Sequence, residues 1–178
     1  LKPESAKAKA NLGMALLGMG RYQEGWPLYN AVIGFDKSRR KVQYAKEPAW
    51  DGSPGKRLVI YGEQGLGDEI SFASMIPDAI REAKSVIIDC DVKLEGLFRR
   101  SFPDATVYGT RWEKNLGWNK KDTEIDASCS IGALGQFFRP TPESCPGTPY
   151  LTPDPDRVLM WRSLFASYSK PVIGVSWT

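Results

Sequence analysis

The chain has 178 residues and a mass of 19.8 kDa, enough to bury a substantial hydrophobic core. Its 42% hydrophobic and 25% charged residues are typical of globular proteins and exclude the disordered and collagen-like classes. A net charge of +3 gives no indication of a nucleic-acid partner, and the apolar runs are too short for a membrane span.

Two residue types restrict the possible chemistry. The chain has no histidine, and its three cysteines, Cys90, Cys129 and Cys145, lack the close spacing of metal ligands. We therefore expect no metal site, reduced thiols and a cytoplasmic location. Ser-His and Cys-His catalytic pairs are excluded, so a general base would be a carboxylate, a lysine or a tyrosine.

Residues 1–35 carry their apolar side chains at helical spacing. Gly18-Met19-Gly20 separates a first apolar run from a second run that contains Tyr22, Trp26, Tyr29 and Ile33. The pattern predicts a hairpin of two helices, with Trp26 in the core. Pro27 is expected to kink the second helix, because proline removes a backbone hydrogen bond.

Residues 36–56 are polar and rich in helix-breaking residues, which predicts a linker. The basic cluster Lys37-Ser38-Arg39-Arg40-Lys41 lies within it. This cluster lacks the length and the interleaved aromatic residues of a nucleic-acid patch, so we interpret it as a solvated connecting segment.

Strands and helices are expected to alternate after residue 57. The expected strands are 57–62, 85–89, 105–108 and 124–127, and the expected helices are 66–81, 92–101, 131–138 and 156–168. This order predicts an α/β domain over residues 57–171, with a Rossmann-like, doubly wound parallel sheet and helices on both faces. Trp161 is expected in its core. The apolar run 172–177 predicts another strand, and we expect residues 172–178 to begin a truncated C-terminal domain.

The stretch Tyr61-Gly62-Glu63-Gln64-Gly65-Leu66-Gly67-Asp68-Glu69-Ile70 joins the first strand of this domain to its first helix. Ligands of open α/β sheets bind at the carboxyl ends of the strands, so this loop is expected to border a site. Its three carboxylates oppose the pyrophosphate of a dinucleotide, and the Gly-Lys-Ser/Thr of a P-loop is missing. We therefore predict no cofactor here, and substrate binding by Glu63, Gln64, Gly65 and Gly67.

Asp68 would lie in the first turn of the helix, facing the ligand crevice. The helix dipole stabilises an ionised carboxylate there by about 0.3–1 kcal/mol. Such a group could accept a proton from a hydroxyl nucleophile. The alternative is that Asp68 or Glu69 only caps the helix.

Other residues allow competing interpretations. Asp89-Cys90-Asp91 has the D-x-D pattern of metal-dependent glycosyltransferases, so a metal-dependent enzyme using Asp89 and Asp91 is one alternative. The other is that Asp91 is the N-cap of the following helix. Trp112 and Trp118 lie in the polar stretch 109–123 and are candidates for ligand binding.

The hairpin resembles a tetratricopeptide repeat. The matching positions are Leu12-Gly13, Leu16, Gly20-Arg21-Tyr22, Glu24-Gly25 and Tyr29. One repeat cannot bury both of its faces, so we expect further repeats or docking on the following domain. A protein partner could bind through such a repeat.

A longer resemblance covers nearly the whole chain. It rests on Gly25-Trp26-Pro27-Leu28-Tyr29, Trp50-Asp51-Gly52, Gly62–Ala79, Pro149-Tyr150-Leu151 and Gly174-Val175-Ser176-Trp177. These segments resemble a bacterial family in which tetratricopeptide repeats are fused to a GT-B glycosyltransferase domain, similar to heptosyltransferases and more distantly to O-GlcNAc transferases. The stretch 109–123 departs from the family, because it is longer and richer in lysine and tryptophan.

This resemblance implies inverting transfer of a sugar from a nucleotide-sugar donor to a hydroxyl acceptor, without a metal. Gly67-Asp68 followed by Pro77 matches the heptosyltransferase segment that carries the proposed base, which implies that role for Asp68. In GT-B enzymes the N-terminal domain mainly handles the acceptor and the C-terminal domain mainly grips the nucleotide. The chain would thus supply the acceptor side and be inactive or nearly inactive alone. A noncatalytic module that binds proteins through its repeat is the alternative from a different class.

Overall fold

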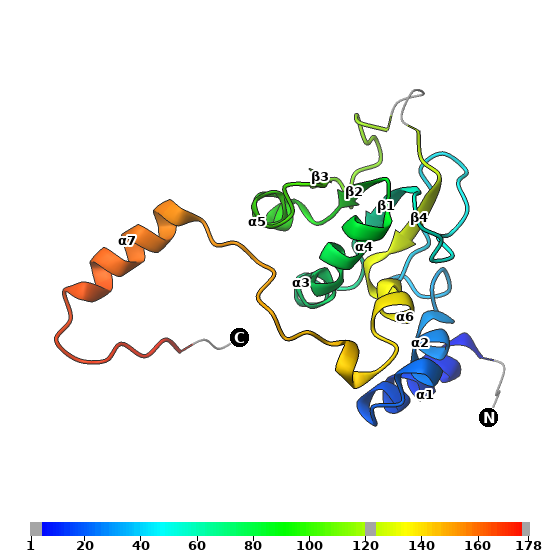
Figure 1. Cartoon of the computed structure of the whole chain (residues 1–178), viewed down its shortest axis with the longest axis horizontal. Helices are drawn as coiled ribbons and strands as arrows, with labels where there is room; N and C mark the ends of the chain where they lie inside the picture. The colour runs from blue at the N-terminus through cyan, green and yellow to red at the C-terminus, as the bar shows by residue number, and fades with distance from the viewer. Residues whose placement is uncertain (1–4, 120–123, 176–178) are drawn as a thin grey trace.

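The computed structural model describes residues 5–119 and 124–175 (Figure 1). Its strands are β1 Arg57–Tyr61, β2 Ser85–Asp89, β3 Thr106–Tyr108 and β4 Ala127–Ser130. Its α-helices are α1 Ala6–Gly18, α2 Tyr22–Asn30, α3 Leu66–Phe72, α4 Ile76–Glu82, α5 Val92–Ser101, α6 Gly135–Phe138 and α7 Pro155–Ala166. Short 3-10 helices are η1 Ala73–Met75, η2 Ile131–Leu134 and η3 Pro142–Ser144.

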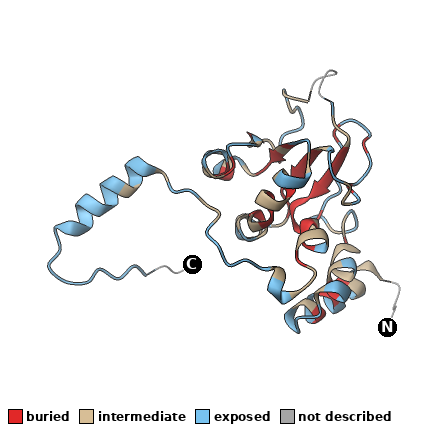
Figure 2. Cartoon of the chain, in the orientation of Figure 1, coloured by how far each residue is buried: buried red, intermediate tan, exposed pale blue. Residues whose placement is uncertain are grey.

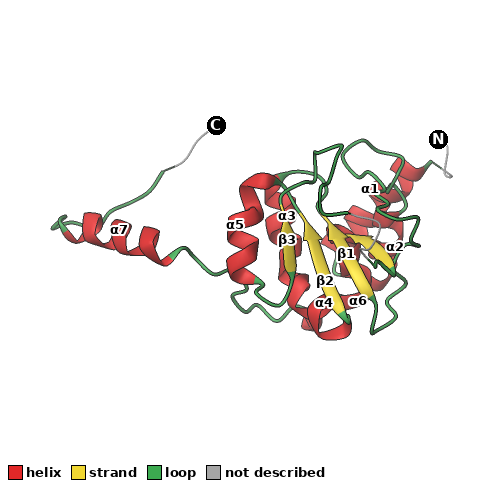
Figure 3. Ribbon diagram, turned by 90° about the horizontal axis from the view of Figure 1, so that it is seen from above, coloured by secondary structure: helices red, strands yellow, loops and turns green. Residues whose placement is uncertain are grey.

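The strands form one four-stranded parallel sheet in the order β3-β2-β1-β4 (Figure 3). Leu58 of β1 lies opposite Val86 of β2 and Ala127 of β4. The same order occurs in the first four strands of a Rossmann fold, and the chain changes direction across the sheet between β1 and β4. The predicted α/β domain with a parallel sheet flanked by helices is confirmed.

One face of the sheet packs against helices. Neighbouring residues of a strand point to opposite faces, so Leu58 and Ile60 lie on the same side of β1. Both join a cluster that includes Ile76 of α4 and Phe98 of α5. The strands are the most continuously buried part of the molecule (Figure 2). This cluster is the main hydrophobic core.

The other face of the sheet has a different cover. Val59 and Tyr61 of β1 form a second cluster with Tyr44, and Trp118 packs against it. Tyr44 and Trp118 come from irregular segments before β1 and after β3, and their ring centroids are 5.3 Å apart. The sequence predicts helices on both faces of the sheet. In the apolar cluster of this face, irregular segments take the place of helices, since large aromatic side chains can cover a sheet without a helix.

The helices α1 and α2 form the predicted hairpin, and glycines allow their close approach. A Cβ atom at Gly13 would lie 2.3 Å from the backbone nitrogen of Tyr29. α2 runs through Pro27 as one helix. Half-buried Trp26 docks the hairpin on the domain, because its Nε1 donates a 2.7 Å hydrogen bond to the carbonyl of Arg139.

Replacing Gly13 with alanine is expected to destabilise the hairpin by about 1–3 kcal/mol, because the new methyl group would overlap backbone atoms of α2. Urea unfolding followed by circular dichroism would measure this loss. Gly18→Ala is the matched control in the same helix, because a Cβ atom there meets nothing within 4 Å. Equal stability of the two variants would contradict the close helix crossing.

The segment 36–56, predicted as a solvated linker, is mostly exposed, but its side chains Arg39, Tyr44, Glu47 and Trp50 are buried against the domain. Arg39 is 3% exposed and Trp50 is 5% exposed. The backbone nitrogen of Trp50 donates a hydrogen bond to the carbonyl of Ser128, so the segment runs beside β4. Buried Glu47 accepts hydrogen bonds from the backbone nitrogens of Tyr44 and Ala45. Burial is possible because these polar groups find partners inside the fold.

Several predicted boundaries differ from the structure. The helix expected over 66–81 is divided into α3, η1 and α4, with Pro77 in the first turn of α4, where its missing N–H costs little. The helix expected over 131–138 consists of η2 followed by α6. The strand expected over 124–127 corresponds to β4, which begins only at Ala127 and ends at Ser130.

The C-terminal segment differs most from the prediction. α7 extends away from the sheet, and Trp161, predicted in the core, is 46% exposed (Figures 1 and 2). Residues 172–175 form no strand, and 176–178 lie outside the described residues. A strand needs a neighbour for its backbone hydrogen bonds, and the described part of the chain offers none here. None of the described helices has the length and apolar character to cross a membrane.

Asp126, just before β4, is tied to Arg57 at the start of β1. The carboxylate accepts hydrogen bonds from the backbone nitrogen, Nε and Nη2 of Arg57 at 2.8, 3.0 and 2.7 Å. These bonds hold the pKa of Asp126 well below its usual range. The ionised form therefore stabilises the folded state above the unfolded-state pKa of about 3.9.

We expect Asp126→Asn to be less stable than the parent chain at neutral pH. The difference should shrink as the pH falls below about 4 toward the folded-state pKa, because the parent carboxylate then takes up its proton. Urea unfolding of both proteins across this range would measure the effect. A difference that stays constant with pH, or an equal effect of the exposed Asp104→Asn, would contradict it.

Candidate functional site

The loops after the strands meet at one edge of the sheet. β1 and β4 flank the point where the chain changes direction, and ligands of open α/β sheets bind at such a point. The glycine loop, Gly62–Gly67, follows β1 and leads into α3. We therefore take this loop and its neighbours as the candidate site.

Asp68 is the third residue of α3 and is half-buried. Its Oδ2 accepts a 2.9 Å hydrogen bond from the backbone nitrogen of Gly65, so it does cap the start of its helix. No other described residue donates a hydrogen bond to the carboxylate. A Cβ atom at Gly67 would meet nothing within 4 Å, so the space beside the loop is open. The capping interaction thus leaves Oδ1 available.

Glu63 is buried in an ion pair rather than turned toward a ligand. Its side chain is 1% exposed and accepts bonds of 3.0 and 2.8 Å from Nε and Nη2 of Arg39. Arg39 also donates to the carbonyl of Tyr29 and to the side chain of Asn30. A Cβ atom at Gly132, after β4, would lie 2.2 Å from Oε1 of Glu63. The pair therefore fills the space between the loops after β1 and β4.

Glu69 forms a second buried ion pair, with Arg111 from the loop after β3. It also accepts a 3.1 Å hydrogen bond from the backbone nitrogen of Asp91. Burial raises the pKa of Glu69, and the positive charge of Arg111 opposes that shift. Of the three carboxylates in the stretch 61–70, Glu63 and Glu69 are therefore paired with arginines. The stretch is rich in acidic residues, as the sequence predicts. Of its three carboxylates, however, only Asp68 has no cationic partner among the described residues.

Gln64 has a left-handed backbone, with φ of 58°. Its Nε2 donates a 2.6 Å hydrogen bond to the hydroxyl of Tyr29 in α2. The hairpin therefore contacts the candidate site directly. No local sequence pattern marks Tyr29, Arg39 and Arg111 as site residues, because their segments lie far apart in the sequence and meet at this loop only in the folded chain.

The two candidate tryptophans lie in different places. Trp112 is 58% exposed, and its Nε1 donates a 2.9 Å hydrogen bond to Asp91. Its ring lies 4.3 Å from the guanidinium carbon of Arg111. Trp118 instead stacks on Tyr108 in the second face of the sheet, with centroids 4.7 Å apart. Trp118 also donates a 2.8 Å hydrogen bond to the hydroxyl of Thr110, just after β3, so it covers the sheet while Trp112 is exposed.

Asp89 and Asp91 are held by protein hydrogen bonds. Buried Asp89 accepts bonds from the hydroxyl of Tyr44 at 2.8 Å and that of Thr110 at 2.7 Å, and burial raises its pKa. Asp91 is the N-cap of α5 and accepts a bond from the backbone nitrogen of Lys93. Within residues 5–119 and 124–175, no three acidic, histidine or cysteine side chains are grouped to share a metal ion.

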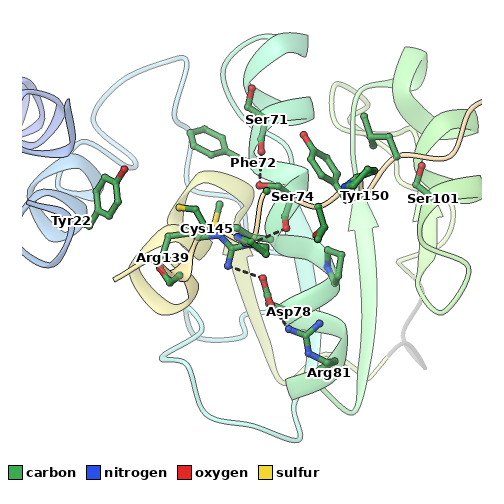
Figure 4. A pocket seen from close by; sticks show the side chains of 18 of the residues that line it. Tyr22, Ser71, Phe72, Ser74, Asp78, Arg81, Ser101, Arg139, Cys145 and Tyr150 are labelled. Carbon is green, nitrogen blue, oxygen red and sulfur yellow. Dashed lines mark hydrogen bonds and ion pairs between the residues drawn. The ribbon is translucent and has the colours of Figure 1, made fainter. Parts of the chain in front are cut away.

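A cavity of about 1150 Å³ lies beside the helices rather than at the glycine loop (Figure 4). Tyr22 of α2 lines one side, and Cys145 and Tyr150 line another. Ser71 also lines the cavity. It lies one turn after Asp68, on the same face of α3. Asp68 itself is not among the residues that line the cavity.

A salt bridge forms part of the cavity wall. Asp78 of α4 pairs with Arg139 at 2.8 Å and also with Arg81 (Figure 4). Arg139 further donates a 3.0 Å hydrogen bond to the carbonyl of Ser74. These residues match no sequence motif and lie on separate elements, so no local pattern predicts their pairing.

Comparison with known proteins gives one informative relative. No protein-family model matches the chain, and no solved structure does. The chain is 31% identical to Protein FlbA of Caulobacter vibrioides over 179 residues. That alignment includes 91% of this chain and 30% of the relative, so the chain spans about a third of that protein's length.

Proposed function

We propose that the chain is the acceptor-side half of an inverting glycosyltransferase of the GT-B type, with Asp68 as its general base. The observation that carries this proposal is the state of the Asp68 carboxylate. One oxygen is held by the backbone of Gly65, the other has no donor among the described residues, and open space adjoins the loop. A carboxylate fixed in this way can accept a proton without a change of its position.

In the proposed reaction, a hydroxyl group of the acceptor approaches Oδ1 of Asp68. The hydroxyl oxygen attacks the anomeric carbon of a nucleotide sugar, and its proton passes to Asp68. The bond between the anomeric carbon and the diphosphate oxygen breaks, and the nucleoside diphosphate leaves with the bonding electrons. Trp112 offers an exposed ring surface for acceptor binding at the same edge.

Residues 172–178 would begin the second, donor-binding domain in this proposal. The exposed apolar side chains of α7 support it. Trp161 is 46% exposed and Phe165 is 45% exposed, which is unusual for large apolar residues on one helix. A following domain could cover them.

A noncatalytic module that binds proteins is the second candidate. The cavity between the hairpin and the sheet domain favours it, because its walls combine Tyr22 and Trp26 of the hairpin with Ser71 and Asp78 of the domain. The two candidates differ in their need for Asp68. Replacement of Asp68 by asparagine, with sugar transfer as the readout, decides between them.

A further inference from the structure

Gln64 has a backbone conformation that a side chain usually avoids. Its φ of 58° lies in the left-handed region, where a non-glycine residue is strained. Glycine would adopt this conformation without strain, and glycines stand nearby at Gly62 and Gly65. The strain at Gln64 therefore indicates that its side chain is used.

Three hydrogen bonds hold Gln64, and each comes from a different part of the chain. The backbone nitrogen donates to the carbonyl of Ser38 at 2.8 Å. The carbonyl accepts from Nη2 of Arg111 at 2.6 Å, and the side chain donates to the hydroxyl of Tyr29 at 2.6 Å. A strained residue persists when its surroundings fix it from several directions, and such residues concentrate at functional sites.

The partners of Gln64 are themselves fixed. The guanidinium of Arg39 lies 4.0 Å from the ring centroid of Tyr29, and Arg39 is paired with buried Glu63. Burial raises the pKa of Tyr29, so its phenol keeps its proton. Arg111 is held by its ion pair with Glu69. The two buried ion pairs therefore support the residues that hold Gln64.

The conformation of Gln64 determines the direction of the next N–H group. That group belongs to Gly65, and it donates the hydrogen bond that fixes Oδ2 of Asp68. We propose that Gln64 is a positioning residue: its bond to Tyr29 sets the Gly65 N–H and thereby orients the Asp68 carboxylate. The helical hairpin is thus part of the site. This inference rests on the proposed function for its catalytic meaning, but the coupling can be measured without catalysis.

The experiment compares Tyr29→Phe, Gln64→Met and the double variant of this chain by NMR-detected amide hydrogen exchange. Each single change removes the same side-chain hydrogen bond and keeps most of the packing. We expect exchange at Gly65 to rise about tenfold in each, as for the loss of a typical hydrogen bond. The double variant should match the single ones, because both changes break one interaction.

Trp26→Phe is the control. It removes another hydrogen bond between the hairpin and the domain, to Arg139, and keeps an aromatic ring beside Tyr29. It should lower the thermal midpoint and leave exchange at Gly65 unchanged. Unchanged exchange at Gly65 in both Tyr29→Phe and Gln64→Met would overturn the proposal. So would additive effects in the double variant, or an equal rise in the control.

A second readout uses the protein that also carries the donor-binding half. Gln64→Met should lower kcat for sugar transfer about tenfold and leave KM for the acceptor within about twofold, as expected when only the transition state is affected. An increase in KM alone would overturn the positioning role. If Asp68→Asn leaves transfer unchanged, the proposed function fails, while the exchange data still decide whether Gln64 orients the carboxylate.

Discussion

Asp68→Asn is expected to lower the rate of sugar transfer by about 100-fold or more, which is the usual effect of removing a general base. The asparagine side chain has nearly the same shape, and its amide oxygen can still accept the hydrogen bond from Gly65. The free energy of unfolding should therefore stay within about 1 kcal/mol of the parent value. Transfer would be measured in the protein that carries both halves, and unfolding in urea on this chain.

Asp154→Asn is the matched control for this experiment. Asp154 is also a carboxylate at the start of a helix: it is the N-cap of α7 and accepts hydrogen bonds from the backbone nitrogens of Asp156 and Arg157. Asparagine is an equally good N-cap, so both stability and transfer should be retained. Normal transfer by Asp68→Asn would refute the assignment of the base. A large loss of stability in that variant would show that Asp68 serves mainly as a cap.

Arg39→Met is expected to have the largest effect on stability, about 3–5 kcal/mol, because it leaves a buried carboxylate without its partner. The side chains of Arg39 and Glu63 are only 4% and 1% exposed. The variant also loses the bonds from Arg39 to Tyr29 and Asn30. Urea unfolding would measure the loss, and the variant should begin to unfold at much lower denaturant concentration.

The double variant Arg39→Met/Glu63→Met tests the cause of this loss. Replacing both charges with apolar side chains removes the desolvated carboxylate, so the double variant should be more stable than Arg39→Met alone. Arg21→Met is the control, because Arg21 pairs with Glu24 on the exposed surface of the hairpin. It should leave stability nearly unchanged. A double variant as unstable as the single one would show that the charge of Glu63 is not the cause.

Much of the fold could be predicted from the sequence. Val92–Ser101 and Ser85–Asp89 begin and end where the apolar pattern places them. These elements follow from local spacing, since a helix or strand displays its pattern within a few residues. The division of the helix at η1, with Pro77 at the start of α4, and the start of β4 at Ala127 do not follow from the local pattern.

The candidate site could be predicted only in part. The glycine loop and Asp68 were found because a turn between a strand and a helix has a local signature. The burial of Glu63 and Glu69 was not, since their partners Arg39 and Arg111 are 24 and 42 residues away in sequence. Their charges therefore suggested an acidic loop where the structure has two neutralised pairs.

The sequence by itself determined the alternation of strands and helices, the helical hairpin and the position of one carboxylate at the start of a helix. Those features depend on interactions within a few residues. Only the tertiary structure decided that Arg39 and Trp50 of the segment 36–56 are buried, that Gln64 is held in a strained conformation, and that Tyr29 reaches the glycine loop. These features depend on contacts between distant segments, whose free energy exists only once the chain has brought the segments together.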